Sequence, residues 1–223
     1  MPKTLKENKQ ENKEKITEVV FILDRSGSMR PLEKDTINGF NSFIKEQKTK
    51  NKNTLITTVL FSDDYEMIHN RVNINEIKEL TENDYYTYGM TALLDAVGNT
   101  ISLIKSKHHY GSIYPDNTIF VITTDGEENY SRKYSYREIK RIISEMQELY
   151  DWEFIFLADN IDAAATAQNM GIDRRRAMNY NSKYETQTLF DSVAMYCDME
   201  PVVRKSVPIT KVFNEAKNKG KDK

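Results

Sequence analysis

The sequence predicts an α/β fold with a doubly wound, mostly parallel sheet, one antiparallel edge strand and helices on both faces. Short apolar runs rich in β-branched residues recur along the chain and are separated by segments with helical spacing. One of these runs is followed closely by a hairpin partner, which predicts the antiparallel edge. The length of 223 residues suits one large domain of this kind.

The first apolar run, residues 18–23, is predicted to be a strand that is buried on both faces. A helix is expected next, because the following apolar residues recur at helical spacing. Residues 54–61 are strongly β-forming, and residues 65–71 are predicted to pair with them beyond an exposed turn at Asp63 and Asp64. The apolar face of the helix comprises Ile37, Phe40, Phe43 and Ile44.

Strands and helices are then expected to alternate to the end of the domain. The short helix among them is predicted to end at Gly171, because glycine readily adopts a left-handed conformation. The predicted helices are residues 91–107, 135–150, 162–170 and 184–199, and the predicted strands are residues 117–125, 152–158 and 176–180.

The chain is expected to contain one domain, residues 16–200, between two basic tails. Residues 1–15 are predicted to form a flexible N-terminal tail, and residues 201–223 are predicted to form a C-terminal extension and basic tail. Lys, Asn and Glu dominate residues 1–15 and the basic tail at residues 211–223, and both are expected to be disordered because they lack the apolar residues that would offset chain entropy. The net charge of the whole chain is -2 although both tails are basic, so the part between the tails must be acidic. An acidic domain argues against nucleic-acid binding.

Cysteine usage and hydropathy predict a cytoplasmic protein that does not bind membranes. Cys197 is the only cysteine, which excludes an internal disulfide and a cysteine-rich zinc site and fits a reducing compartment. It is expected to lie in the core of the last helix. No apolar run approaches the ~18 residues that a membrane span needs, and the N-terminus lacks the apolar region of a signal peptide.

Oxygen-bearing side chains follow two central strands and precede a helix. Asp24, Ser26 and Ser28 follow the first strand, Thr91 precedes the second long helix, and Asp125 follows the strand at residues 117–125. In such sheets ligands bind beyond the carboxyl ends of the strands. A donor set of hydroxyl and carboxylate oxygen favours a hard divalent cation, Mg²⁺ first with Mn²⁺ or Ca²⁺ possible, over zinc or copper.

These five residues resemble a known motif. The segment Asp24-Arg-Ser-Gly-Ser28, the later Thr91 and the Thr-Asp-Gly around Asp125 are together similar to the von Willebrand factor type A domain with an intact metal-ion-dependent adhesion site. The resemblance covers about residues 16–199 and implies a Rossmann-like fold. It implies that Ser26, Ser28 and Thr91 supply hydroxyls and that the two aspartates bind the metal directly or through water. Met90 departs from the pattern, because a second glycine often stands there.

The resemblance implies an intracellular protein-interaction module that binds an Asp or Glu of a partner protein through the cation. Two alternatives remain at this stage: a Mg²⁺-dependent hydrolase or phosphatase, and a structural domain with an unused metal site. An aspartyl nucleophile would want a second carboxylate and a positioned Lys close to Asp24, whereas Ser26 and Ser28 follow it, so no catalytic residues are assigned and no enzyme activity is expected. Arg25 and Arg30 are near the motif but receive no role.

Two of the three site loops are rich in tyrosine, a residue that is favoured at interfaces. Tyr88, Tyr130 and Tyr134 are the candidate partner-binding residues, with ordinary loop packing as the competing explanation. The other polar motifs receive structural interpretations. His108 and His109 are expected to end a helix, Glu127 and Glu128 to lie in a solvated loop, and Arg174, Arg175 and Arg176 to form a solvated turn.

Overall fold

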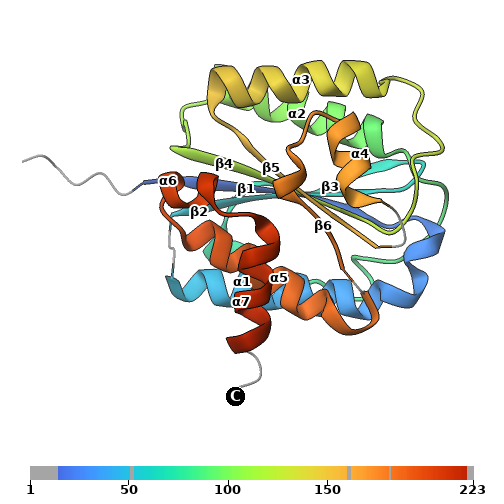
Figure 1. Cartoon of the computed structure of the whole chain (residues 1–223), viewed down its shortest axis with the longest axis horizontal. Coiled ribbons are helices and arrows are strands. Elements are labelled where there is room, and N and C mark those ends of the chain that lie inside the picture. Colours follow the sequence, from blue (N-terminus) through green and yellow to red (C-terminus); the bar gives the residue numbers. More distant parts are fainter. Residues whose placement is uncertain (1–14, 51–52, 160–161, 181, 220–223) are drawn as a thin grey trace, which may run out of the picture.

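The protein folds around a single six-stranded sheet (Figure 1). The computed structural model describes residues 15–50, 53–159, 162–180 and 182–219, so the predicted N-terminal tail lies outside the described residues except for Lys15. The strand order is β3-β2-β1-β4-β5-β6, and all neighbours are parallel except β2 and β3. The strands are β1 (Thr17–Asp24), β2 (Thr54–Phe61), β3 (Tyr65–Asn73), β4 (Asn117–Thr124), β5 (Glu153–Ala158) and β6 (Ala177–Asn179).

The order in which strands are added to the sheet reverses at β1, so the carboxyl end of β1 lies at the topological switch point. β2 pairs with one side of β1, and β4 returns to the other side. In open α/β sheets the loops diverge at such a point and leave a crevice that ligands occupy. The loops after β1 and β4 therefore lie where the sequence predicts the metal site.

Helices cover both faces of the sheet, and α2, α3 and α4 lie on the opposite face from α1, α5 and α7 (Figure 1). Within the described residues, none of these helices is both long and apolar enough to cross a membrane. The α-helices are α1 (Glu33–Lys50), α2 (Leu93–Tyr110), α3 (Tyr136–Tyr150), α4 (Ala163–Asn169), α5 (Ser182–Asp198), α6 (Pro201–Ser206) and α7 (Ile209–Lys219). The 3-10 helices are η1 (Gly27–Leu32), η2 (Ile74–Glu76) and η3 (Arg174–Arg176).

Alternate side chains of β1 enter two separate apolar clusters. Phe21 and Leu23 belong to the cluster under α1, α5 and α7, whereas Val20 and Ile22 belong to the cluster under α2, α3 and α4. The whole strand is buried, because successive side chains of a strand point to opposite faces and both faces are covered. The prediction of a strand buried on both faces is confirmed.

Smaller expectations are also confirmed. Gly171 has a φ of 85°, the left-handed conformation predicted for the end of α4. Cys197 is a buried free thiol in α5, and burial raises its pKa to about 12. His108 and His109 lie in the last turn of α2.

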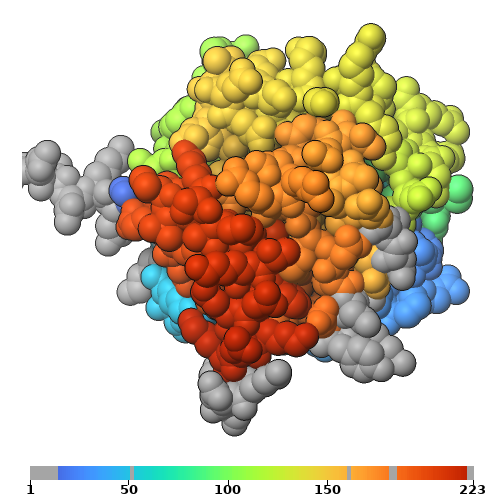
Figure 2. Space-filling model, in the orientation of Figure 1, coloured from blue at the N-terminus to red at the C-terminus, as the bar shows by residue number. Residues whose placement is uncertain are grey.

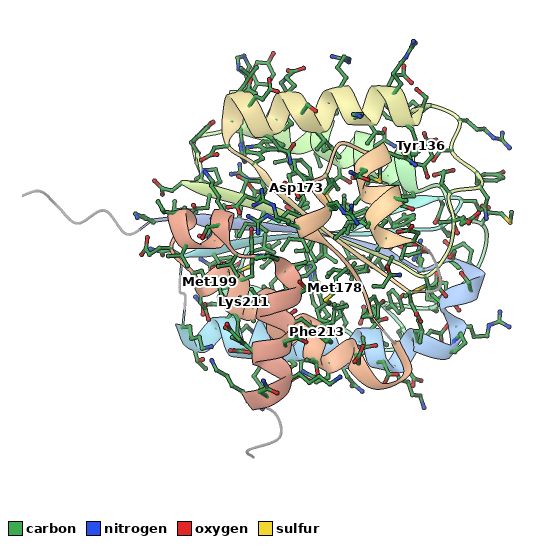
Figure 3. The ribbon with its side chains drawn as sticks, viewed as in Figure 1. Tyr136, Asp173, Met178, Met199, Lys211 and Phe213 are labelled. Atoms are coloured by element: carbon green, nitrogen blue, oxygen red, sulfur yellow. The ribbon has the colours of Figure 1, made fainter. Side chains whose placement is uncertain are left out.

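The C-terminal segment differs from its prediction as an extension with a disordered basic tail. It forms α6 and α7, and α7 buries one apolar face. Phe213 of α7 and Met178 of β6 belong to the same apolar cluster (Figure 3). In the space-filling view the C-terminal helices form a continuous surface with the preceding segment (Figure 2). The helix could have been predicted from apolar residues at helical spacing, but the high lysine content led to a prediction of disorder. These apolar residues are buried in the structure: Ile209, Val212, Phe213 and Ala216.

A buried ion pair attaches α6 to the amino ends of the central strands. The Arg204 side chain is 2% exposed, and its Nε donates to Glu153 Oε1 at 2.8 Å. Its Nη2 donates to Asn117 Oδ1 at 3.1 Å, and the Tyr196 hydroxyl donates to the other oxygen of Glu153 at 2.6 Å. The C-terminal helices are thus held to β4 and β5 by polar as well as apolar contacts.

Helices α1 and α5 approach closely at Gly39, which gives the first prediction. A Cβ at this position would lie 2.3 Å from Cδ2 of the buried Phe190 ring. Gly39→Ala is expected to lower the free energy of unfolding by about 1–2 kcal/mol, because overpacking outweighs a gain of about 1 kcal/mol in helix propensity. Urea denaturation measures this change. Lys45→Ala, an exposed change in α1, is the control, and an unchanged or more stable Gly39→Ala protein would contradict the prediction.

Candidate metal centre

Three loops bring the predicted ligands to the carboxyl edge of the sheet. Asp24 is the last residue of β1, and Ser26 and Ser28 lie in the turn and 3-10 helix that follow. Asp125 comes directly after β4, the neighbour of β1. Thr91 lies two residues before α2. Four of these five residues are buried, and Ser28 is exposed.

Asp24 is held by hydrogen bonds from three segments. Its Oδ1 accepts from the backbone N–H of Ser26 at 2.7 Å, and its Oδ2 accepts from the Thr124 hydroxyl at 2.5 Å. Its main-chain oxygen accepts from the hydroxyl of the buried Tyr85, also at 2.5 Å. Thr124 and Tyr85 had no predicted role, and only the pairing of β1 with β4 and the path of the Tyr85 loop bring them to Asp24.

The hydroxyl groups gather between the two aspartates. Ser28 Oγ donates to Asp125 Oδ1 at 2.7 Å and lies 3.1 Å from Ser26 Oγ. A Cβ placed on Gly126 would lie 3.4 Å from Ser28 Oγ and 3.5 Å from Thr91 Oγ1, so these two hydroxyls face the same small space. The structure therefore brings together the five residues that the sequence predicts as ligands.

The two carboxylates lie in an unfavourable environment for negative charge. Burial raises the pKa of Asp24 from its ordinary value of 3.8 to about 6. Burial also raises the pKa of Asp125, and the nearby charge of Asp159 adds to this effect. Among the described residues, neither carboxylate forms an ion pair with a Lys, Arg or His. A bound cation would supply the missing positive charge.

The chemistry of the donor set fits a hard divalent cation. Two carboxylates and three hydroxyls are all oxygen donors, the kind that Mg²⁺, Mn²⁺ and Ca²⁺ prefer. Within the described part of the chain, no group of three or more His, Cys, Asp and Glu side chains could hold a metal. The oxygen donors that gather here are the three hydroxyls and the two aspartates that the sequence predicts.

The loop before α2 runs alongside the Asp24–Ser28 loop. The N–H of Tyr88 donates to Arg25 O at 2.9 Å, and the N–H of Gly27 donates to Gly89 O at 3.1 Å. Gly89 has a φ of 75°, and a Cβ there would lie 1.8 Å from Asp63 Oδ1, so glycine is required. The departure at Met90 leaves these bonds in place, and the methionine side chain is 47% exposed.

Arg25 is the most important residue of the site region that received no role from the sequence. Its side chain is 1% exposed, and it forms ion pairs with Asp64 at 3.0 Å and Glu66 at 2.7 Å. Its Nη2 also donates to the Tyr88 hydroxyl at 2.8 Å. Arg25 thus joins the Asp24–Ser28 loop, called the metal loop below, to the β2–β3 turn and to the loop before α2. In the sequence, the only hint of this contact is the pair of acids after β2, Asp64 and Glu66, which are spaced two residues apart.

The loop after Asp125 is fixed to the start of α2. Glu128 Oε2 accepts from the N–H of Leu94 at 2.9 Å, and Ser131 Oγ accepts from the N–H of Asp95 at 3.0 Å. These acceptors satisfy helix N–H groups that would otherwise lack partners. The interpretation of Glu128 as a solvated residue is wrong, because it is half-buried and caps α2, whereas Glu127 is exposed.

The three candidate partner-binding tyrosines lie in different surroundings. Tyr88 contacts Arg25 beside the metal loop. Tyr130 lies under the Arg132 guanidinium, whose carbon is 4.7 Å from the ring centroid. Tyr134 packs over Gly98 of α2, so ordinary packing accounts for its position. Their partner-binding role stays a prediction, and among them Tyr88 has the most direct connection to the metal loop.

The other polar motifs lie outside the site. His108 is buried, with Nε2 2.6 Å from Glu18 Oε2, at the amino end of β1. The expectation of a solvated turn fits Arg174 and Arg175, which are exposed, but not Arg176. Arg176 donates to Val207 O at 2.7 Å and lies 5.2 Å from the Tyr196 ring centroid.

Comparison with known proteins identifies a family. A sequence model described as the von Willebrand factor type A domain matches residues 18–192. Comparison with curated protein sequences finds no match. The matched range contains all five candidate ligands and ends within α5.

Several solved structures share the fold at low sequence identity. Proximal thread matrix protein 1 from the mussel byssus, in a structure with a zinc-occupied metal-ion-dependent adhesion motif, is 15% identical with a TM-score of 0.59, over 81% of this chain and 48% of that one. The PilB minor pilin of Streptococcus sanguinis is 12% identical with a TM-score of 0.58, over 83% and 62%. The pilus adhesin SpaC of Lactobacillus rhamnosus GG is 10% identical with a TM-score of 0.64, over 81% and 30%. The first of these neighbours is about twice as long as the segment matched here.

The raised pKa of Asp24 gives the second prediction. The folded protein keeps a proton between about pH 4 and pH 6 that the unfolded chain has released, so the stability from this group is lost as the pH rises. Asp24→Asn is expected to raise the free energy of unfolding of the metal-free protein at pH 7 by about 1–3 kcal/mol, because an amide carries no charge.

Urea denaturation with a chelator, at pH 4 and at pH 7, measures this difference. The gain should be largely absent at pH 4, where the aspartate is protonated. Glu79→Gln, which removes an exposed carboxylate outside the site, is the control. A less stable Asp24→Asn protein at pH 7 would show that the buried charge is not the dominant cost.

Proposed function

The chain belongs to the von Willebrand factor type A domain family, and on this basis we propose that it binds a protein partner through a metal ion. In this proposal the five residues at the carboxyl edge form a metal-ion-dependent adhesion site for a divalent cation, Mg²⁺ first. A partner Asp or Glu binds to that cation. The observation that carries the proposal is the convergence of three hydroxyls and two carboxylates from three separate loops.

The residues have distinct parts in this proposal. Ser26, Ser28 and Thr91 would bind the metal through neutral hydroxyls, and Asp24 and Asp125 would bind it directly or through water. When bound, the cation supplies positive charge and coordination positions open to an incoming carboxylate. Two carboxylates formally balance a divalent charge, but where an aspartate binds through water the directly bound groups are mostly neutral, so the cation would keep its attraction for a partner's carboxylate.

The surroundings of the site support binding over catalysis. Phosphoryl transfer through an aspartyl nucleophile would use a positioned cationic side chain together with the metal to stabilise the transferred group. Arg25, directly after Asp24 in sequence, is neutralised by Asp64 and Glu66 and has little exposed surface. We therefore propose a binding module without enzyme activity. We also propose a reducing, cytoplasmic location, which fits the buried free thiol of Cys197.

Calorimetric titration with Mg²⁺, Mn²⁺ and Zn²⁺ tests the metal site. Asp24→Ala is expected to abolish binding, and Thr91→Val to weaken it by about tenfold or more, since it removes one hydroxyl while keeping the side-chain shape. A metal at 100 times its dissociation constant should stabilise the native protein by about 2.7 kcal/mol. Thr210→Val, the same change on the exposed face of α7, is the matched control. Equal binding by native protein and Asp24→Ala would refute the site.

Two assays test the function of the loaded site. Proteins captured by the native protein in Mg²⁺ should be lost when Asp24→Ala replaces it or when a chelator is added. Turnover of p-nitrophenyl phosphate that depends on both Mg²⁺ and Asp24 would contradict a pure binding function. Metal binding without any Asp24-dependent partner would favour a structural domain with an unused site.

A further inference from the structure

We propose that Tyr86, Tyr88 and Met90 form an apolar ledge beside the metal site, held in place by Arg25. The ledge would select partners that carry a large apolar side chain within about three residues of the metal-binding carboxylate. This inference rests on the proposed function, because it assumes that a partner's carboxylate reaches the metal. It adds the chemistry of the partner and assigns a positioning role to Arg25.

The ledge exposes apolar surface at the metal edge of the molecule. Tyr86 is 49% exposed and Met90 is 47% exposed, and both lie in the loop that leads to Thr91. The other large apolar side chains exposed on the described surface lie in α6 or near the carboxyl ends of α2 and α3, away from this edge. They are Tyr110, Ile113, Tyr114, Leu149, Tyr150, Val202 and Val203.

Backbone contacts fix the ledge next to the proposed ligands. Met90 lies between Gly89, whose oxygen accepts from Gly27 N–H, and the candidate ligand Thr91. Gly27 itself lies between Ser26 and Ser28. Consecutive Cα atoms are 3.8 Å apart, and an extended peptide covers about 10 Å in three residues. A partner segment bound at the metal can therefore reach Met90 and its neighbours within that length.

Arg25 and the tyrosines form a stacked group. The guanidinium carbon of Arg25 lies 4.9 Å from the Tyr88 ring centroid and 5.5 Å from that of Tyr86. The two rings stack on each other with centroids 5.5 Å apart and an interplanar angle of 22°. Asp64 and Glu66 neutralise the charge of Arg25, so Arg25 is not available to bind an anion from a partner. Its role is to hold the two tyrosine rings in place by cation–π contact.

The base of the loop is anchored as well. Glu33 Oε1 accepts from the N–H of Thr87 at 2.8 Å and from its hydroxyl at 2.5 Å. The Tyr88 hydroxyl donates to Asp64 at 2.5 Å. Rings that are already ordered bind a partner with little further loss of conformational freedom. The ledge is thus a preformed surface on the loop that ends at the candidate ligand Thr91 and is hydrogen-bonded to the Asp24–Ser28 loop.

Three capped peptides that differ at single positions test the inference: Gly-Glu-Gly-Phe-Gly, Gly-Glu-Gly-Gly-Gly and Gly-Gln-Gly-Phe-Gly. Their dissociation constants for the native protein are measured by NMR titration in saturating Mg²⁺. The peptide with Glu and Phe is expected to bind about tenfold more tightly than the peptide with Glu and Gly, because it places an aromatic anchor on the ledge. The Gln peptide should not bind detectably.

Variants connect this preference to the ledge. Tyr86→Ala and Met90→Gly should each bring the affinity ratio of the two Glu peptides toward one, and Arg25→Gln should do so as well. Arg25→Lys retains the charge but loses the planar stacking group, so an intermediate ratio is expected. Val202→Ala, which removes an exposed apolar side chain far from the site, should leave the ratio unchanged. The ratio separates a loss of positioning from general damage, which would weaken both Glu peptides equally.

The outcomes distinguish the inference from the proposed function. Equal affinity of the native protein for the two Glu peptides would overturn the ledge and leave metal-dependent carboxylate binding intact. A ratio unchanged in Tyr86→Ala, Met90→Gly and Arg25→Gln would also overturn it. Failure of both Glu peptides to bind the metal-loaded protein would refute carboxylate binding and the ledge together.

Discussion

The placement of a buried carboxylate at the end of β1 is the constraint on which the rest of the site depends. The Asp24 side chain is fully buried and has no ion-pair partner among the described residues, so its oxygens must be satisfied by hydrogen bonds. These bonds come from the next turn and from the end of β4. The pairing of β1 with β4 is thus both the centre of the sheet and the support of the site.

The site loops are held to one another as well as to the sheet. Arg25 joins the metal loop to the β2–β3 turn, and Glu128 joins the loop after Asp125 to the start of α2. Both contacts use charged groups that the sequence alone would place in solvent. Each loop is hydrogen-bonded or ion-paired to a neighbouring loop or helix, so the positions of the candidate ligands depend on one another. A metal site needs its ligands held in this way by surrounding contacts.

The amino and carboxyl ends of the strands carry different kinds of polar contact. At the amino ends of the strands, Arg204 and Glu153 attach the C-terminal helices through a buried ion pair. At the carboxyl ends, Asp24 and Asp125 form no ion pair with a cationic side chain among the described residues. The apolar layers between them supply the rigid frame, so the polar groups at one end are available for binding. Structures only 10–15% identical share this frame, which shows how little of it depends on particular residues.

The strands, the main helices and the five candidate ligands could be predicted from the sequence, because these predictions depend on local periodicity and on the motif around Asp24. The sequence could not assign Arg25, Thr124 or Glu128, whose partners lie 34 to 100 residues away in the sequence. It also missed α7, since a short lysine-rich helix is stable only when its apolar face packs on the domain. Tertiary structure alone decided which tyrosines pack and which lie exposed, because long-range contacts determine the burial of each ring.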